Sequence, residues 1–199
     1  MTDPSLPRRV QDRLVRYYGL EDVPDVEAFL APRDDAQRER VLVLETEDGV
    51  EVRVELPRET IHPARPLTFD ELCQVVEGVS HFVLIAERAR CELPLTALEL
   101  ELQAEVDKFV LLGVAATRRS TPATLAHLRH RLFSSARFVD APGTEAGERY
   151  RLASRLAWQF VCRLERSYFK AARPRELREA LRRFFRAGQT TKLELALAA

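Results

Sequence analysis

A change in the spacing of apolar residues constrains the fold of this chain more than any other feature of its sequence. Between residues 41 and 56, apolar side chains alternate with charged ones around an Asp48-Gly49 turn signal. A period of two is typical of strands with one buried face, and Asp-Gly favours a tight hairpin turn. We therefore predict a β-hairpin over 41–56. Because an isolated hairpin is marginal in water, it must pack on helices or acquire another strand, which 192–197 could supply by its own alternation.

Beyond residue 66 the apolar spacing becomes helical. Thr68 and Glu71 have the spacing of a capping box, and the apolar residues that follow recur at i, i+3, i+4 and i+7 as far as Ala86. We prefer a single helix that continues through Gly78. The alternative is a helix that ends at Gly78 and a buried strand over 81–86, since that run is rich in apolar and β-branched residues.

Other segments also have helical patterns, and they set the fold class. The expected helices are Ser5–Tyr18, a brief turn at 25–30, Thr96–Leu112, Thr121–Phe133, Glu148–Lys170 and Pro174–Ala187. The prediction is an α+β fold that is predominantly α-helical. It consists of an irregular helical bundle with an N-terminal β-hairpin and a strand that the C-terminal tail could add. We expect residues 1–199 to form a single compact domain.

Charge is segregated along the chain although its total is balanced at 31 basic and 31 acidic residues. The N-terminal part, 1–117, has 13 basic and 24 acidic residues, whereas the helical part 118–188 has 17 basic and 6 acidic ones. An Arg-rich half attracts an anionic surface, which could belong to its own acidic half, a second copy, nucleic acid or another protein. The split therefore favours an interaction protein, and complementary halves make a homo-oligomer one of the options.

Several function classes find no support in the sequence. The motifs of phosphate-binding loops, dinucleotide-binding folds, serine hydrolases and zinc proteases are all absent, and the chain has only seven glycines. Cys73, Cys91 and Cys162 are odd in number and widely spaced, so we predict neither disulfides nor a zinc site. We expect no cofactor. The absence of a membrane-length apolar run favours a cytoplasmic protein, and the use of Arg over Lys with no Asn favours a GC-rich bacterial genome.

Four residues are weak candidates for catalysis or metal binding. Glu77 and His81 are one helical turn apart, and so are Glu101 and Glu105 on the next expected helix. If the two helices were antiparallel neighbours, these side chains could converge as an acid–base or divalent-metal site. Charged residues at helical spacing are more often ordinary surface groups, so we predict no metal site and no confident catalytic residue.

The basic half supplies the stronger candidates. Its two last expected helices each have an apolar stripe and an Arg-rich side, with aromatic residues near the arginines. Such a surface can bind a protein partner, and it can also grip phosphates and stack on bases. The candidate partner-binding residues are Arg151, Arg155, Trp158, Arg163, Arg166, Arg178, Arg182 and Arg186.

Three functional hypotheses follow from these patterns. The leading one is a non-enzymatic cytoplasmic interaction protein, an adaptor or regulatory subunit that binds a protein partner or a second copy of itself through the Arg/aromatic helices. The alternative is a nucleic-acid-binding protein that uses the same helices. Acidic Glu176 and Glu179 interrupt that surface, and phosphate-binding helices would generally avoid them, so the protein partner is preferred. The third is a small metal-dependent or acid–base enzyme centred on the four candidates above.

Overall fold

The structure is a computed structural model that describes residues 3–34, 39–46, 49–117, 122–136, 138–169, 171 and 173–198. The chain divides into two compact units, residues 1–94 and 95–199. Within the described residues the fold is α+β and predominantly helical, as predicted, with one three-stranded sheet. Whether the two units act as one domain remains a prediction.

The first unit begins with helix α1, Leu6–Tyr18, which has the ends that the sequence predicts. The Ser5 hydroxyl accepts a hydrogen bond from the backbone N–H of Arg8 at 3.2 Å and so caps the first turn. Gly19 ends the helix with a left-handed backbone, φ 62°, which glycine adopts without steric cost.

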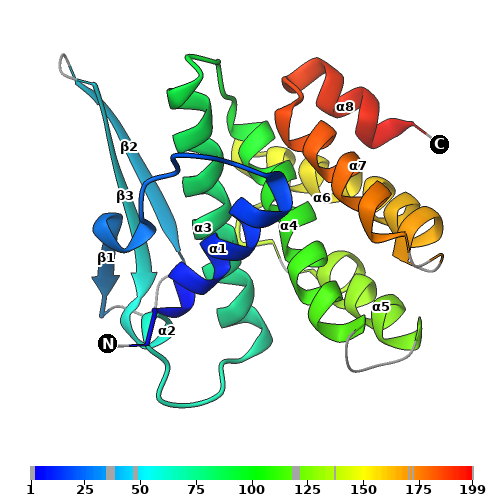
Figure 1. The fold of residues 1–199 in the computed structure, drawn as a ribbon, viewed down its shortest axis with the longest axis horizontal. Helices are drawn as coiled ribbons and strands as arrows, with labels where there is room; N and C mark the ends of the chain where they lie inside the picture. Colours follow the sequence, from blue (N-terminus) through cyan, green and yellow to red (C-terminus); the bar gives the residue numbers. More distant parts are fainter. Residues whose placement is uncertain are drawn as a thin grey trace. The chain divides into compact units, whose positions relative to one another are not determined.

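The predicted hairpin is confirmed as strands β2, Arg40–Thr46, and β3, Gly49–Pro57, which pair antiparallel (Figure 1). Residues 47 and 48, at the expected turn, lie outside the described residues. The third strand is not the C-terminal tail but β1, Leu30–Arg33, which follows a short 3₁₀ turn, η1, over Val26–Phe29 and pairs parallel with β3. Four residues that include Pro32 are too few to show alternation, so the sequence analysis missed this strand.

A one-turn helix, α2 (Arg58–Ile61), leads from the sheet to α3, Phe69–Arg90. The predicted capping box is present at its start, and α3 is one continuous helix, so the alternative of a strand over 81–86 is wrong. Gly78 lies where α3 crosses the sheet. A Cβ at Gly78 would be 3.2 Å from Leu56 Cδ2 of β3, and the missing side chain therefore permits a close approach of helix and strand.

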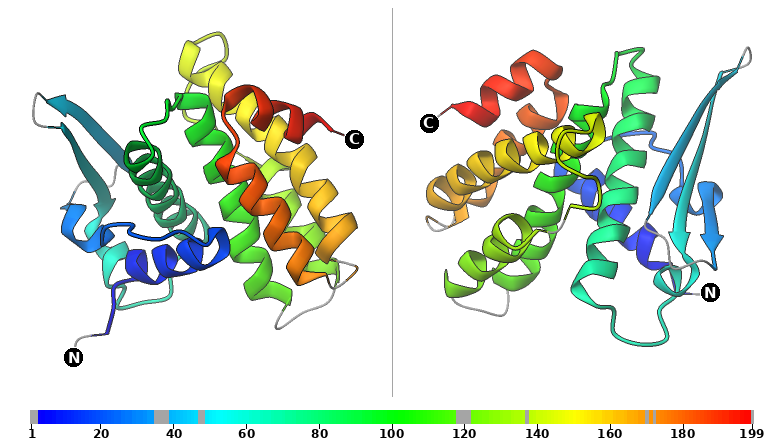
Figure 2. Two further views of the ribbon diagram at one scale, coloured as in Figure 1. Left: turned by 45° about the horizontal axis from the view of Figure 1, so that its top comes forward. Right: turned by 180° about the vertical axis from the view of Figure 1, so that it is seen from behind.

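The second unit is helical: α4 (Ala97–Thr117), α5 (Pro122–Arg129), η2 (His130–Ser134), α6 (Glu145–Leu164), η3 (Glu165–Phe169), α7 (Pro174–Arg186) and α8 (Gln189–Leu197) (Figures 1 and 2). Two predicted ends were wrong. Helix α4 continues past Gly113, whose bare backbone allows Leu125 of α5 to approach, and α6 begins at Glu145 because the Thr144 hydroxyl caps it. Among the described residues, no helix combines the length and the apolar character needed to cross a bilayer.

A buried polar network attaches the last helix to α4. The Nζ of Lys192 donates to Gln103 Oε1 at 2.9 Å, and Gln103 Nε2 donates to Asp107 Oδ1 at 3.0 Å. Lys192 and Gln103 are fully buried, and the ammonium lies 5.0 Å from the centre of the Phe184 ring of α7. The predicted strand over 192–197 is therefore wrong. The chain buries Lys192 and Ala196, which are one helical turn apart, and leaves Leu197 exposed.

The network predicts the effect of replacing Lys192 with Met, which keeps the apolar stem and removes the ammonium. Gln103 Oε1 then loses its donor inside the protein, so we expect Lys192→Met to lower the free energy of unfolding by about 2 kcal/mol. Glu194→Gln, on the exposed side of α8, is the control and should change it by less than about 0.5 kcal/mol. Urea denaturation measures both, and an unchanged or raised stability of Lys192→Met would contradict this role.

The start of α3 predicts a pH effect. Hydrogen bonds from Arg65 and from the backbone of Thr68 lower the pKa of Glu71 from 4.5 to about 2. Because the folded-state pKa is the lower one, this contribution to stability is complete above about pH 4.5 and is lost as the pH falls through about 2. An NMR titration of the Glu71 carboxyl should show the low midpoint, and Arg65→Ala should raise it while Arg16→Ala leaves it unchanged.

Candidate partner-binding pocket

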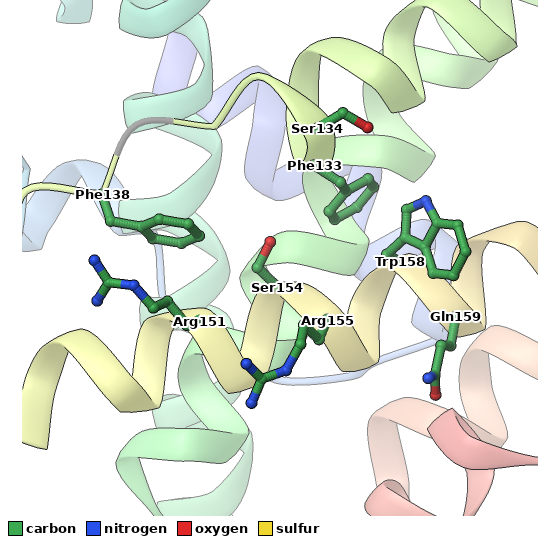
Figure 3. A pocket seen from close by; sticks show the side chains of 8 residues that line it. All are labelled: Phe133, Ser134, Phe138, Arg151, Ser154, Arg155, Trp158 and Gln159. Atoms are coloured by element: carbon green, nitrogen blue, oxygen red, sulfur yellow. The ribbon is translucent and has the colours of Figure 1, made fainter. Parts of the chain in front are cut away.

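A pocket of about 480 Å³ lies in the second unit, between α6 and the segment that leads from η2 into the following loop (Figure 3). Its volume falls within the range of about 300–1,000 Å³ that is usual for ligand sites. The residues that line it are Phe133, Ser134, Phe138, Arg151, Ser154, Arg155, Trp158 and Gln159. Three of them, Arg151, Arg155 and Trp158, are predicted partner-binding residues.

Aromatic rings form the apolar part of the pocket. Phe133 comes from η2, Phe138 from the loop and Trp158 from α6. Trp158 is 45% exposed and Phe138 is 38% exposed, although both are large apolar side chains. Figure 3 shows the Ser154 hydroxyl directed toward the space between Phe133 and Phe138. The pocket therefore offers aromatic stacking surfaces beside the Ser154 hydroxyl.

Arg151 is fixed at one end of the pocket. Its guanidinium carbon lies 4.9 Å from the centre of the Phe138 ring, and Nη2 donates to the backbone oxygen of Asp140 at 3.1 Å. Nη1 is buried and has no hydrogen-bond partner among the described residues. Arg151 thus holds the loop against α6 and keeps Phe138 in position.

Arg155, one helical turn after Arg151, is not held by neighbouring groups as Arg151 is. It is exposed on the rim of the pocket, and within the described part of the chain it has no ion pair or hydrogen bond. None of the eight lining residues is acidic. The rim is therefore positively charged, and the Arg155 guanidinium has five N–H donors available for an anion.

Gly147 allows the loop and Arg151 to meet at the first turn of α6. Its N–H donates to the capping Thr144 hydroxyl at 3.1 Å, and that hydroxyl donates to the Ala141 oxygen at 2.8 Å. A Cβ on Gly147 would lie 2.1 Å from the Ala141 oxygen and 2.6 Å from Arg151 Nη1. Only glycine fits there without displacement of the loop. The sequence analysis assigned no role to Gly147.

The other predicted partner residues do not line the pocket. Arg163 donates to the backbone oxygens of Leu195 and Ala198 at the end of α8, and burial lowers its pKa. Arg163 is therefore engaged inside its unit. Arg166 is exposed in η3, and the remaining three residues, Arg178, Arg182 and Arg186, are on α7.

The four candidate catalytic residues lie on two helices. Glu77 is buried and His81 half-buried on α3, one turn apart as predicted. Glu101 is buried on α4, where the half-buried Glu105 forms an ion pair with Lys108 at 2.5 Å. Helices α3 and α4 belong to different units, so each pair lies within one unit. Convergence of the four residues remains a prediction.

Most of the lining residues escaped the sequence analysis, and one signal could have indicated them. Phe133 ends one expected helix, and Phe138 lies in the short connection to the next expected helix, Glu148–Lys170. A helical wheel identifies the arginines and Trp158 on α6, but it cannot show which loop residues fold back onto them.

Comparisons of this chain with protein-family profiles, curated proteins and solved structures found no match. The function is therefore argued from the pocket itself.

The close packing at the start of α6 predicts the effect of Gly147→Ala. The added methyl group displaces the Ala141 oxygen and Arg151, and we expect a loss of about 1–3 kcal/mol in the free energy of unfolding. Because Trp158 is the sole tryptophan, its fluorescence should also change as the loop moves. Gly188→Ala is the control, since a Cβ there meets nothing within 4 Å. Equal effects of the two substitutions would contradict the role of Gly147 in packing the Ala141 oxygen and Arg151 against the first turn of α6.

Proposed function

We propose that this protein is a non-enzymatic cytoplasmic interaction protein, an adaptor or regulatory subunit, that binds a protein partner through the pocket on α6. The observation that carries the proposal is the rim of this pocket. Arg155 lies there, one turn from the half-exposed ring of Trp158. Its guanidinium has no partner among the described residues. Trp and Arg are the residues most enriched among the few that dominate binding energy at protein interfaces.

The chemistry of the lining supports binding more than catalysis. The eight residues include no carboxylate, imidazole or thiol, so the hydroxyls of Ser134 and Ser154 have no general base among them to activate a nucleophile. The third hypothesis, an acid–base or metal enzyme, would have to operate elsewhere, at Glu77, His81, Glu101 and Glu105.

Nucleic acid is the second candidate partner, because an arginine beside an exposed indole also suits stacked bases. However, only two guanidiniums line the pocket among the described residues, and Arg151 is already engaged with Asp140 and Phe138. Nucleic-acid binding draws most of its energy from many phosphate contacts. A pocket whose described residues offer one available guanidinium fits a protein side chain better than a phosphate backbone.

Purification from the native cell tests the proposal. The wild-type protein should carry a stoichiometric partner, either another protein or a second copy that raises its solution mass. Arg155→Glu should reduce the retained partner by at least about tenfold, since it reverses the charge on the rim. Arg175→Glu is the matched control, because Arg175 is also an exposed helical arginine but lies on α7 and does not line the pocket.

Three results would contradict the proposal. The first is a strictly monomeric protein without a partner, and the second is a partner that both variants retain equally. The third is bound nucleic acid, detected by the ultraviolet absorbance ratio of the preparation and by steep loss as salt rises, which would favour the second candidate.

A further inference from the structure

We infer that the pocket recognises an acidic segment of the partner that bears an aromatic anchor residue, with the anchor between Phe133, Phe138 and Trp158 and a neighbouring carboxylate on Arg155. The inference rests on the proposed function and specifies the chemistry of its ligand. It follows from three features of the described pocket residues: the aromatic walls, the available guanidinium of Arg155, and the hydroxyl and amide groups.

The walls favour an aromatic anchor. Three rings from three different segments surround one space, and two of them are more than a third exposed. A ring inserted among them gains offset or edge-to-face contacts, worth about 0.5–1.5 kcal/mol per pair beyond the burial of apolar area. An aliphatic anchor would gain the burial but not these contacts.

The rim favours a carboxylate beside that anchor. Arg155 has neither an ion pair nor a hydrogen bond within the described residues, and no acidic residue lines the pocket to repel an anion. A planar guanidinium can donate two parallel N–H bonds to one carboxylate, and such bonds are about twice as strong as neutral ones. Since Arg155 and the three rings line the same pocket, we place the carboxylate on the anchor residue itself or on an adjacent residue.

The remaining polar groups suit a peptide backbone. The Ser154 hydroxyl and the Gln159 amide both line the pocket, and each can donate as well as accept a hydrogen bond. A peptide presents both kinds of partner at every residue. A free aromatic base would offer ring edges but no repeating amide, so we favour a protein segment.

Trp158 provides the readout for the test, as it is the sole tryptophan and lies in the site. The probe is an acetylated and amidated pentapeptide with a central Phe flanked by Asp and Glu, titrated into the full chain at low salt. Two altered peptides accompany it, one with Asn and Gln in place of the acids and one with Ala in place of Phe. A short single-stranded oligonucleotide is titrated in parallel.

We expect the acidic Phe peptide to change Trp158 fluorescence saturably and each altered peptide to bind about tenfold more weakly, which corresponds to about 1.4 kcal/mol. Arg155→Gln should weaken the acidic peptide about tenfold as well, with little further loss for the amide peptide. Such non-additivity shows that the guanidinium and the carboxylates contact each other. Arg175→Gln should bind like the wild type, and because Arg155 is exposed its variant should fold normally.

The possible failures are distinguishable. Equal binding of the acidic and amide peptides, or an unaffected Arg155→Gln variant, overturns carboxylate recognition. If no peptide binds but the native partner is still lost in Arg155→Glu, this inference fails and the proposed function stands. If the oligonucleotide alone binds and salt abolishes its binding, both proposals fail.

Discussion

Burial of the Lys192 ammonium is the constraint on which the second unit depends. An ammonium inside a protein is costly unless it is hydrogen-bonded, and here α4 supplies Gln103 and α7 supplies the face of Phe184. The C-terminal helix must therefore lie where these two groups meet. Arg163 of α6 then donates hydrogen bonds to backbone oxygens at the end of α8. Helix α8 is therefore joined to α4 and α7 near its start and to α6 at its end.

The arginines of this unit divide into internal and available groups. Arg129 pairs with the buried Glu165 at 2.8 Å, Arg163 holds α8, and Arg151 fixes the loop. Arg155 has no such partner among the described residues, although it lies one turn from Arg151 on the same helix. Arginine content alone therefore overstates the cationic surface, and the pocket depends on which guanidinium the fold leaves available.

The N-terminal unit shows how its acidic excess is partly balanced from within. Arg33 and Arg40 both contact Glu55, Arg58 contacts Asp34, and Arg65 contacts Glu71. The Arg58–Asp34 pair is exposed and individually weak, whereas Glu55 is buried and accepts hydrogen bonds from both Arg33 and Arg40. The separation of charge along the chain is thus a difference in the net charge of its two parts. Within the acidic part, several carboxylates still contact arginines.

Sequence alone determined the elements whose signals are local. The hairpin followed from alternation, α1 and α3 from their caps, and the α6 arginines from helical spacing, because each depends on neighbours within a few residues. Gly113 resembled a helix end until its partner, Leu125, was in view, whereas Gly78 was correctly predicted to lie within a helix.

Tertiary structure decided the rest. The alternating tail became a helix because Lys192 had a buried acceptor on α4, and β1 formed because β3 offered it an edge. The pocket likewise required Phe138 to return to α6 from a loop, which Gly147 permits. Local pattern specifies which face a residue occupies, whereas burial, close approach and available charge depend on segments distant in sequence, and only the folded chain brings those segments together.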